Sequence, residues 1–245
     1  MSDKWVLFLG ANSDMAVSAA RKFASEGYNI FLASRDLGAC NNEAKNIRIR
    51  YRVSVEAMQF DASDYMSHED FYSRLPARPI GVILAFGQMY EQADAQNSFS
   101  LARKMIEVNY LGSVSILEII TRDFEINGGE FIIGVSSVAG DRGRMSNYIY
   151  GSTKSALTTY LSGLAHRMSK SKISVITVKP GFVYTKMTNH LMLPAMLTAS
   201  SNEVGEAIFG SINKGPKTIY VKRVWRLIML LIVHIPSFIF HKTKL

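Results

Sequence analysis

Short apolar runs recur along the chain, and the stretches between them are long enough to hold helices. The first, at residues 5–9, is a continuous apolar run of the kind found in strands that are buried on both faces. The others lie at residues 28–33, 53–60, 80–85, 130–136, 173–178 and 218–221. Strands that alternate with helices predict an α/β fold in which a mostly parallel sheet is covered on both faces. The pattern alone does not fix the order of the strands.

The chain has 245 residues, which is enough for one large hydrophobic core. We expect a single domain over residues 1–221, followed by a tail over residues 222–245. The single cysteine, Cys40, excludes an intrachain disulfide and a multi-cysteine metal site. The five histidines show no ligand spacing, so no metal is expected. No secretory signal precedes the first apolar run, which predicts a cytoplasmic protein.

The turn after residues 5–9 is a candidate phosphate-binding loop. A helical pattern follows it and ends at a glycine before the second run, which predicts a βαβ unit. Backbone N–H groups at the N-terminus of such a helix point at anions, and the helix dipole adds to the attraction. We expect a nucleotide to contact this turn through Gly10, Asn12, Ser13, Asp14 and Met15. The alternatives are an ordinary βα turn, and an Asp14 side chain that caps the helix.

The end of the second run bears on the choice of nucleotide. A carboxylate there accepts hydrogen bonds from the ribose 2′-hydroxyl of NAD, whereas an arginine pairs with the 2′-phosphate of NADP. In this chain Ser34 occupies the position, Arg35 follows it, and Asp36 comes next. We therefore favour NADP(H) over NAD(H). A ribose contact by Asp36, or a purely surface role for Arg35, is the alternative.

A Tyr-x-x-x-Lys pair is the candidate catalytic element. If residues 147–168 form a helix, Tyr150 and Lys154 lie one turn apart on the same face. A lysine ammonium beside the phenol is expected to lower the pKa of the tyrosine from about 10, so that it exchanges a proton with a substrate oxygen. Ser137, after the run 130–136, is expected to hydrogen-bond the same oxygen. The three residues predict carbonyl/alcohol interconversion; a solvated helix face is the alternative for the pair alone.

From about residue 4 to residue 221 the chain resembles the short-chain dehydrogenase/reductase family. The resemblance implies a Rossmann-like, doubly wound sheet of about seven strands, NAD(P)-dependent oxidoreductase activity on a CH–OH group, and a homodimer or homotetramer. It assigns catalytic roles to Ser137, Tyr150 and Lys154, and adds Asn109, which helps to hold a proton-relay water. Besides Tyr150 and Lys154, it implies cofactor contacts by Asp61, Ala62, Ala85, Gly87, Pro180, Gly181, Val183 and Thr185.

Two motifs depart from the family pattern. The family's three phosphate-loop glycines fall at Gly10, Asp14 and Ala16, so only the first is kept. Its Asn-Asn-Ala-Gly motif after the fourth strand is replaced by Leu84-Ala-Phe-Gly87. Those asparagines mainly brace the sheet, so we interpret their loss as structural variation. The departures also give weight to an alternative function, a catalytically silent nucleotide-sensing or interaction protein on the same scaffold.

The tail is both basic and apolar. Leu227–Val233 is a run of seven apolar residues with basic residues on both sides, while Pro236 interrupts the stretch that follows. The stretch is too short for a span of about 20 residues. We expect it to bind an anionic membrane surface on the cytoplasmic side; packing against an oligomer partner, or back over the active-site cleft, is the alternative. The other basic residues behind the net charge of +8 are scattered, and no nucleic-acid partner is expected.

The segment from Val183 to Ser201 falls in the family's substrate-lid region. It is rich in residues that adapt to irregular hydrophobic ligands: Met187, Leu191, Met192, Leu193, Pro194, Met196 and Leu197. A helix packed on the core is the alternative. Lid and tail together suggest a carbonyl substrate with a long apolar part. The chain is also similar to reductases of a 2-keto pentose carried on a polyprenyl phosphate, and a soluble reductase of small ketones is the remaining alternative.

Overall fold

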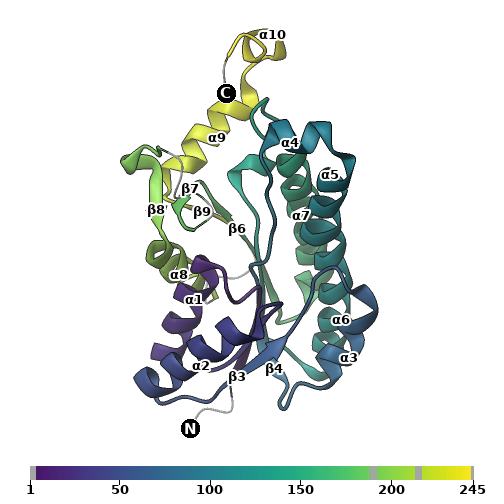
Figure 1. Cartoon of the computed structure of the whole chain (residues 1–245), viewed down its shortest axis with the longest axis vertical. Helices are drawn as coiled ribbons and strands as arrows, with labels where there is room; N and C mark the ends of the chain where they lie inside the picture. The colour runs from purple at the N-terminus through teal and green to yellow at the C-terminus, as the bar shows by residue number, and fades with distance from the viewer. Residues whose placement is uncertain (1–3, 187, 189–191, 213–216, 244–245) are drawn as a thin grey trace.

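Seven parallel strands form the central sheet of the protein. The structure is a computed structural model that describes residues 4–186, 188, 192–212 and 217–243. The order of the strands is β3-β2-β1-β4-β5-β6-β9, as in a doubly wound sheet (Figure 1). They are β1 (Trp5–Leu9), β2 (Asn29–Ser34), β3 (Val55–Gln59), β4 (Pro79–Leu84), β5 (Phe131–Val135), β6 (Ser174–Pro180) and β9 (Lys217–Val221).

Helices cover both faces of this sheet (Figure 1). One buried cluster joins the sheet to α1 (Asp14–Ser25), α2 (Leu37–Tyr51) and α8 (Ser201–Phe209). A second joins the opposite face to α3 (His68–Ser73), α6 (Gly112–Asn127) and α7 (Tyr148–Arg167). Each helix presents an apolar stripe to the sheet; in α1 the stripe is Ala16, Ala19, Ala20 and Phe23, all fully buried.

Shorter elements complete the described part of the chain. After β4 come α4 (Gln92–Asn97), α5 (Phe99–Ile106) and a single π-helical turn (Glu107–Leu111). The 3-10 turns are Tyr65–Ser67, Val138–Gly140, Met168–Lys170 and Ala195–Leu197. A second, two-stranded sheet pairs β7 (Phe182–Tyr184) with β8 (Thr198–Ser200).

The strand order creates a switch point beside β1. The chain passes from β1 to β2 on one side and later returns to place β4 on the other side of β1. The loops that leave the carboxyl ends of β1 and β4 therefore diverge to opposite faces of the sheet. A crevice opens at such a point in α/β sheets, and it is where they bind ligands.

The tail folds back on the body of the protein. In α9 (Val224–His234) the side chains of Trp225, Met229 and Ile232 are buried against Val138, in the loop after β5. The opposite face of α9 is exposed, with Leu227, Leu230 and Leu231 at 63%, 56% and 70% exposure. The helix ends before Pro236, and the short α10 (Ser237–Phe240) follows. No helix within the described ranges combines the length and the apolar character needed to cross a bilayer.

The observed strands confirm the expected fold. Each of the seven predicted runs coincides with a strand of the main sheet, within two residues at either end. The two-stranded sheet of β7 and β8 was not predicted. The alternative of a core-packed helix is wrong for the described part of residues 183–201, because this part contains β7 and β8 and because Met192 and Met196 are exposed. Met187 and Leu191 of the expected lid lie outside the described residues.

Candidate active site

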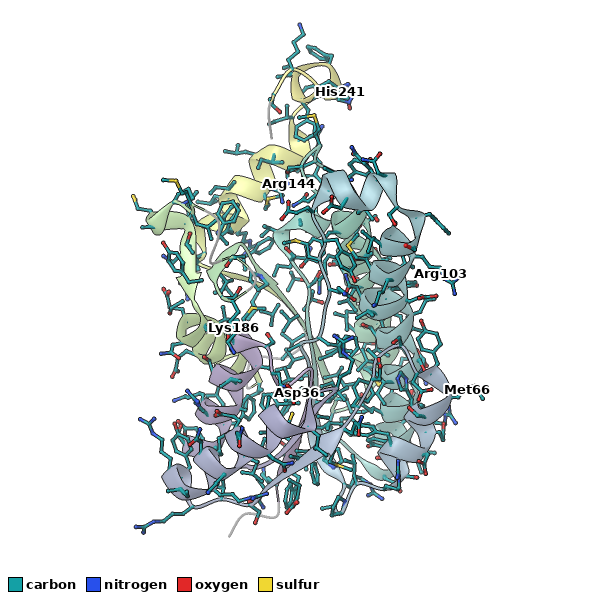
Figure 2. All side chains as sticks on the ribbon, in the orientation of Figure 1. Asp36, Met66, Arg103, Arg144, Lys186 and His241 are labelled. Atoms are coloured by element: carbon teal, nitrogen blue, oxygen red, sulfur yellow. The ribbon has the colours of Figure 1, made fainter. Side chains whose placement is uncertain are left out.

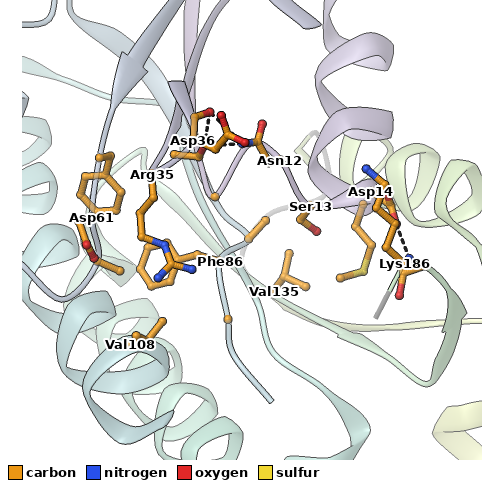
Figure 3. A pocket seen from close by; sticks show the side chains of 18 of the residues that line it. Asn12, Ser13, Asp14, Arg35, Asp36, Asp61, Phe86, Val108, Val135 and Lys186 are labelled. Atoms are coloured by element: carbon orange, nitrogen blue, oxygen red, sulfur yellow. Dashed lines mark hydrogen bonds and ion pairs between the residues drawn. The ribbon is translucent and has the colours of Figure 1, made fainter. Parts of the chain in front are cut away.

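A cavity of about 720 Å³ opens at the switch point (Figure 3). The loops after β1, β2, β3 and β4, the end of β5 and the first turns of α7 line it. Most of the residues expected to form the site line this cavity. They are Gly10, Asn12, Ser13, Asp14, Met15, Ser34, Arg35, Asp61, Ala62, Ala85, Gly87, Tyr150, Lys154 and Thr185.

Five expected residues are not among those that line the cavity. Ser137 forms a hydrogen bond with the lining residue Tyr150, and Asn109 is fully buried. Pro180 is the last residue of β6 and pairs with Val221, and Val183 is buried in the β7–β8 pair. Gly181 lies directly under the indole of Trp225, which a Cβ on this glycine would strike. The tail therefore covers the segment that the resemblance places near the nicotinamide.

Gly10 shapes the first turn. Its backbone is left-handed, with φ at +82°, and a Cβ atom would come within 2.5 Å of the backbone nitrogen of Phe86. Any side chain here would both strain the backbone and push the loop after β4 away from the loop after β1. The retained glycine of the phosphate loop is thus required for the close approach of the two loops that bound the cavity.

The N-terminus of α1 faces the cavity without a side-chain cap. Ser13 is the N-cap residue, but its hydroxyl accepts no hydrogen bond from the first turn. The expectation that Asp14 might cap the helix is wrong. Asp14 is the first helical residue, and its carboxylate accepts a hydrogen bond of 2.7 Å from the backbone nitrogen of Lys186, with the Lys186 ammonium 3.9 Å away (Figure 3). The first-turn N–H groups are therefore open to an anion, and a cation offsets the acid beside them.

Side chains at the end of β2 are held in fixed positions. Asn12 donates a hydrogen bond of 2.7 Å to the hydroxyl of Ser34, and Ser34 is buried. The carboxylate of Asp36 accepts a hydrogen bond of 2.9 Å from Ala39 and caps α2. The exposed Arg35 lines the cavity and has no ion pair within the described part of the chain (Figure 3). Its guanidinium is the group at this end that remains free to pair with an anionic ligand.

Asp61, on the same side of the cavity, carries a stabilised negative charge. Burial raises the pKa of its carboxyl, but hydrogen bonds from the backbone and hydroxyl of Ser63, together with the charge of Arg35, outweigh burial and lower it. The two Ser63 hydrogen bonds measure 2.9 and 2.7 Å and reach the same oxygen of Asp61. The second oxygen is available to accept from a ligand donor such as an amino group.

Tyr150 and Lys154 line the cavity from the first turns of α7, which spans almost the expected 147–168. The Lys154 ammonium lies 5.8 Å from the centroid of the Tyr150 ring and donates a hydrogen bond of 3.1 Å to the carbonyl of Val135. Lys154 is only 3% exposed, and burial lowers its pKa to about 8. The lysine thus points at the end of β5 as well as at the tyrosine.

The expected low pKa of Tyr150 is not observed. Burial raises the pKa of Tyr150 to about 12, although a hydrogen bond with Ser137 lowers it. The physical reason is that the phenolate loses more hydration than this hydrogen bond restores, while the ammonium of Lys154 bonds to a carbonyl instead of the phenol oxygen. Ser137 accepts a hydrogen bond of 3.1 Å from the backbone of Ala139, which leaves its own proton for Tyr150 or a ligand oxygen.

Asn109 lies in the π-helical turn and is fully buried. Its amide accepts a hydrogen bond of 2.7 Å from the backbone nitrogen of Gln88 and donates to the Gln88 carbonyl and to the hydroxyl of Thr153. It therefore fastens the loop after β4 to α7, one residue before Lys154. Irregular helical turns of this kind often occur at functional sites.

Several lining residues were missed by the sequence analysis: Phe60, Phe86, Val108, Val135, Ser136 and Lys186. Asp36, which it named as an alternative ribose contact, also lines the cavity. Phe86 offered a signal, because it is a large aromatic residue directly before the retained Gly87. Ser136 holds the carbonyl of Lys154 at 2.9 Å and could have been inferred from its place beside Ser137. Lys186 carried no signal, since its contact with Asp14 joins residues 172 positions apart.

Comparisons with known proteins identify the family. The short chain dehydrogenase family model matches residues 4–194, and the chain belongs to this family. An uncharacterised oxidoreductase of Mycobacterium tuberculosis is 29% identical over 240 residues, covering 97% of this chain and 96% of the relative. An NADP-dependent 3-hydroxy acid dehydrogenase of Schizosaccharomyces pombe is 28% identical over 193 residues, covering 77% and 74%.

Solved structures agree with the fold. A short-chain dehydrogenase from Sphingobium yanoikuyae in complex with NADPH has a TM-score of 0.77 at 22% identity, covering 96% of this chain and 97% of that one. The chain is therefore an oxidoreductase of the short-chain dehydrogenase type, a class that acts on CH–OH groups with a nicotinamide nucleotide.

Proposed function

We propose that this protein is an NADP(H)-dependent reductase that interconverts a carbonyl and a secondary alcohol. The observation that supports it most directly is that Tyr150, hydrogen-bonded to Ser137, and Lys154 line the same cavity as the open N-terminus of α1. The cavity fits a dinucleotide, because an anion-binding turn and a proton-transfer group line one space of about 720 Å³. The bound nicotinamide supplies the hydride.

In this proposal the residues of the chain handle the proton. Tyr150 stays protonated at neutral pH, because its pKa is raised to about 12, and its O–H donates to the carbonyl oxygen as negative charge develops there. Ser137 donates to the same oxygen and positions it. Lys154 holds the end of β5 through Val135 and, when a nucleotide is bound, is placed to hold the ribose beside Tyr150. Asn109 keeps the loop after β4 against α7 and supports the route of proton resupply.

The choice of NADP(H) follows from the end of β2. The Asp36 carboxylate caps α2, and the Ser34 hydroxyl accepts a hydrogen bond from Asn12. The end of β2 therefore presents no uncommitted carboxylate for a ribose 2′-hydroxyl. Arg35 is exposed at the cavity and suits a 2′-phosphate. The NADP-dependent relative and the NADPH-bound structural neighbour support the same choice. Asp61 and Ala62 are proposed to contact the adenine.

Tyr150→Phe tests the catalytic proposal. The variant keeps the ring and loses the proton donor, so turnover is expected to fall at least 100-fold while NADPH affinity stays within about twofold. Tyr148→Phe is a matched control, because Tyr148 is exposed and lies two residues away on the same helix. Unchanged turnover in Tyr150→Phe contradicts the proposal. Nucleotide binding without turnover in the wild type, on all ketones offered, favours the silent nucleotide-sensing protein.

We further propose that residues 1–221 form the catalytic domain, and that residues 222–245 bring it to the cytoplasmic face of a membrane. The support is the exposed apolar face of α9, with Leu227, Leu230 and Leu231, next to the cations Arg223 and Arg226. An apolar face rimmed by cations suits anionic lipid head groups. The matching substrate is a carbonyl compound with a long apolar part, such as a keto pentose on a polyprenyl phosphate.

Flotation with liposomes tests the membrane proposal. The wild type is expected to float with vesicles that contain anionic lipid and to lose most of this binding when Leu227, Leu230 and Leu231 are replaced with Ser, since the body of the protein is unchanged. Replacement of the exposed Ile49, Met66 and Ile126 with Ser is the matched control. Equal flotation of both triple variants contradicts the proposal. If α9 instead mediates a homodimer or homotetramer of a soluble reductase, the first variant changes the molar mass in solution.

A further inference from the structure

A cluster of unpaired polar groups surrounds the first turn of α7. Within the described residues, five buried side-chain polar atoms lack a hydrogen-bond partner. Four of them belong to the two loops beside Tyr150: Gln88 Oε1, Gln92 Nε2, Arg144 Nε and Asn147 Oδ1. Buried polar groups in folded proteins are paired almost without exception, so four such atoms gathered at one place require an explanation.

Hydrogen bonds tie these residues to the first turns of α7, Gln88 through its bond to Asn109, which in turn donates to Thr153. The carbonyl of Arg144 accepts from the backbone of Asn147 at 3.1 Å, and the carbonyl of Asn147 accepts from Gly151, next to Tyr150, at 2.7 Å. Gln92 accepts a hydrogen bond of 3.2 Å from the backbone of Ile149, on the other side of Tyr150. Gln92, Arg144 and Asn147 therefore lie beside the first turn of α7, which carries Tyr150. Figure 2 shows Arg144 well apart from Asp36 at the end of β2.

Arg144 is the charged member of the cluster and has no acidic partner. It is half-buried, with its Nε enclosed, and neither an ion pair nor a side-chain hydrogen bond is found for it among the described residues. Asp141 is the acid whose charge acts on Arg144, but its carboxylate is already held by Lys179 at 2.5 Å and by the hydroxyl of Tyr220 at 2.9 Å. Burial lowers the pKa of Arg144. A half-buried guanidinium without its own anion is free to pair with an anionic ligand.

We propose that Arg144, with Gln92, binds an anionic group of the substrate, and that the substrate is therefore a carbonyl compound carrying a phosphate or a carboxylate. Arg144 Nε and Gln92 Nε2 are donors that suit an anionic oxygen, whereas Gln88 and Asn147 offer acceptors that suit hydroxyl groups on the same ligand. The assignment rests on the proposed reductase function and narrows its substrate class. It also accounts for the position of the cluster, since an anion bound there places the rest of the substrate beside Tyr150.

Calorimetric titration of the NADP⁺-saturated protein with three matched ligands tests the proposal. Geraniol, geranic acid and geranyl phosphate share one apolar chain and differ in a neutral, carboxylate or phosphate end. At least one anion is expected to bind ten times more tightly than geraniol. Tighter binding of geranyl phosphate indicates a substrate that carries a phosphate, and tighter binding of geranic acid indicates one that carries a carboxylate. In Arg144→Gln the advantage of the anion is expected to disappear. In Arg103→Gln it is expected to persist, because Arg103 is 67% exposed and pairs with Glu107 on the outer surface (Figure 2).

Three outcomes overturn the assignment: equal binding of geraniol and both anions, no binding of any of the three, or an anion advantage that survives in Arg144→Gln. If Arg144→Gln fails to fold, the comparison of geraniol with the two anions in the wild type still tests whether the protein prefers an anion. Arg144→Lys, which keeps the charge, is expected to retain part of the tighter binding of the anion. A failure of the proposed reductase function is recognised separately, since it appears as absent NADP⁺ binding in the saturation step or as nucleotide binding without turnover on any ketone.

Discussion

Replacement of Lys154 with Met is expected to stabilise the nucleotide-free protein at pH 7. Burial lowers the pKa of Lys154 from 10.5 to about 8, and this difference corresponds to about 3 kcal/mol at 1.36 kcal/mol per pH unit. Loss of the hydrogen bond to Val135 offsets about 1 kcal/mol of that gain. The variant is therefore expected to gain about 2 kcal/mol, or about 4–8 °C in Tm for a chain of this length, while losing activity.

The pH dependence of this gain identifies its cause. Because the folded-state pKa of Lys154 lies below its unfolded value, the unfolded chain binds the extra proton between pH 8 and 10.5, and wild-type stability rises through that window. The thioether that replaces the ammonium does not titrate, so the advantage of the variant is expected to shrink to roughly zero near pH 10.

Urea unfolding of the nucleotide-free proteins at pH 7 and pH 10, followed by fluorescence, measures this effect. The exposed Lys170→Met is the matched control and is expected to change the free energy of unfolding by less than about 0.5 kcal/mol at either pH. A Lys154→Met protein that is less stable than the wild type at pH 7, or one whose gain is the same at both pH values, refutes the reasoning.

Other substitutions probe the parts that build the site. Gly10→Ala is expected to destabilise the protein and abolish nucleotide binding in a fluorescence titration, because its Cβ meets Phe86, whereas Gly143→Ala, with open space around it, should bind normally. Asp36→Ala is expected to lower the free energy of unfolding by about 1 kcal/mol through loss of the α2 cap; no change in urea unfolding would contradict this role. Trp225→Ala is expected to cost about 3–5 kcal/mol, since the indole is 4% exposed, and a cost below 1 kcal/mol in the same assay would mean that α9 does not pack as described.

The sequence predicted those features that depend on neighbours along the chain. Apolar runs located the strands because a strand buried on both faces needs a continuous apolar segment, as in Trp5–Leu9. The spacing of Tyr150 and Lys154 placed both on one face of α7 because helix geometry fixes neighbours one turn apart. The cavity lining around the first turn followed from the same local reasoning.

Features that depend on distant contacts were not predictable. The pKa of Tyr150 moved in the opposite direction from the expectation because burial is set by the whole fold, whereas the sequence shows only the neighbouring lysine. The position of the tail is another example. Arg142 donates hydrogen bonds of 2.5, 3.1 and 2.6 Å to the carbonyls of Ile232, Val233 and Ile235, and so fixes the end of α9 on the loop after β5. Nothing in the apolar pattern of the tail specifies that partner.

Fluorescence titration of the wild type and Arg35→Ala with NADPH and NADH tests the proposed NADP(H)-dependent reductase most directly. The wild type is expected to bind NADPH more tightly than NADH, and Arg35→Ala to lose about tenfold or more in NADPH affinity while NADH affinity stays unchanged, because only the 2′-phosphate pairs with the guanidinium. Equal binding of the two nucleotides by both proteins contradicts the NADP(H) assignment, and no binding of either nucleotide contradicts the reductase itself.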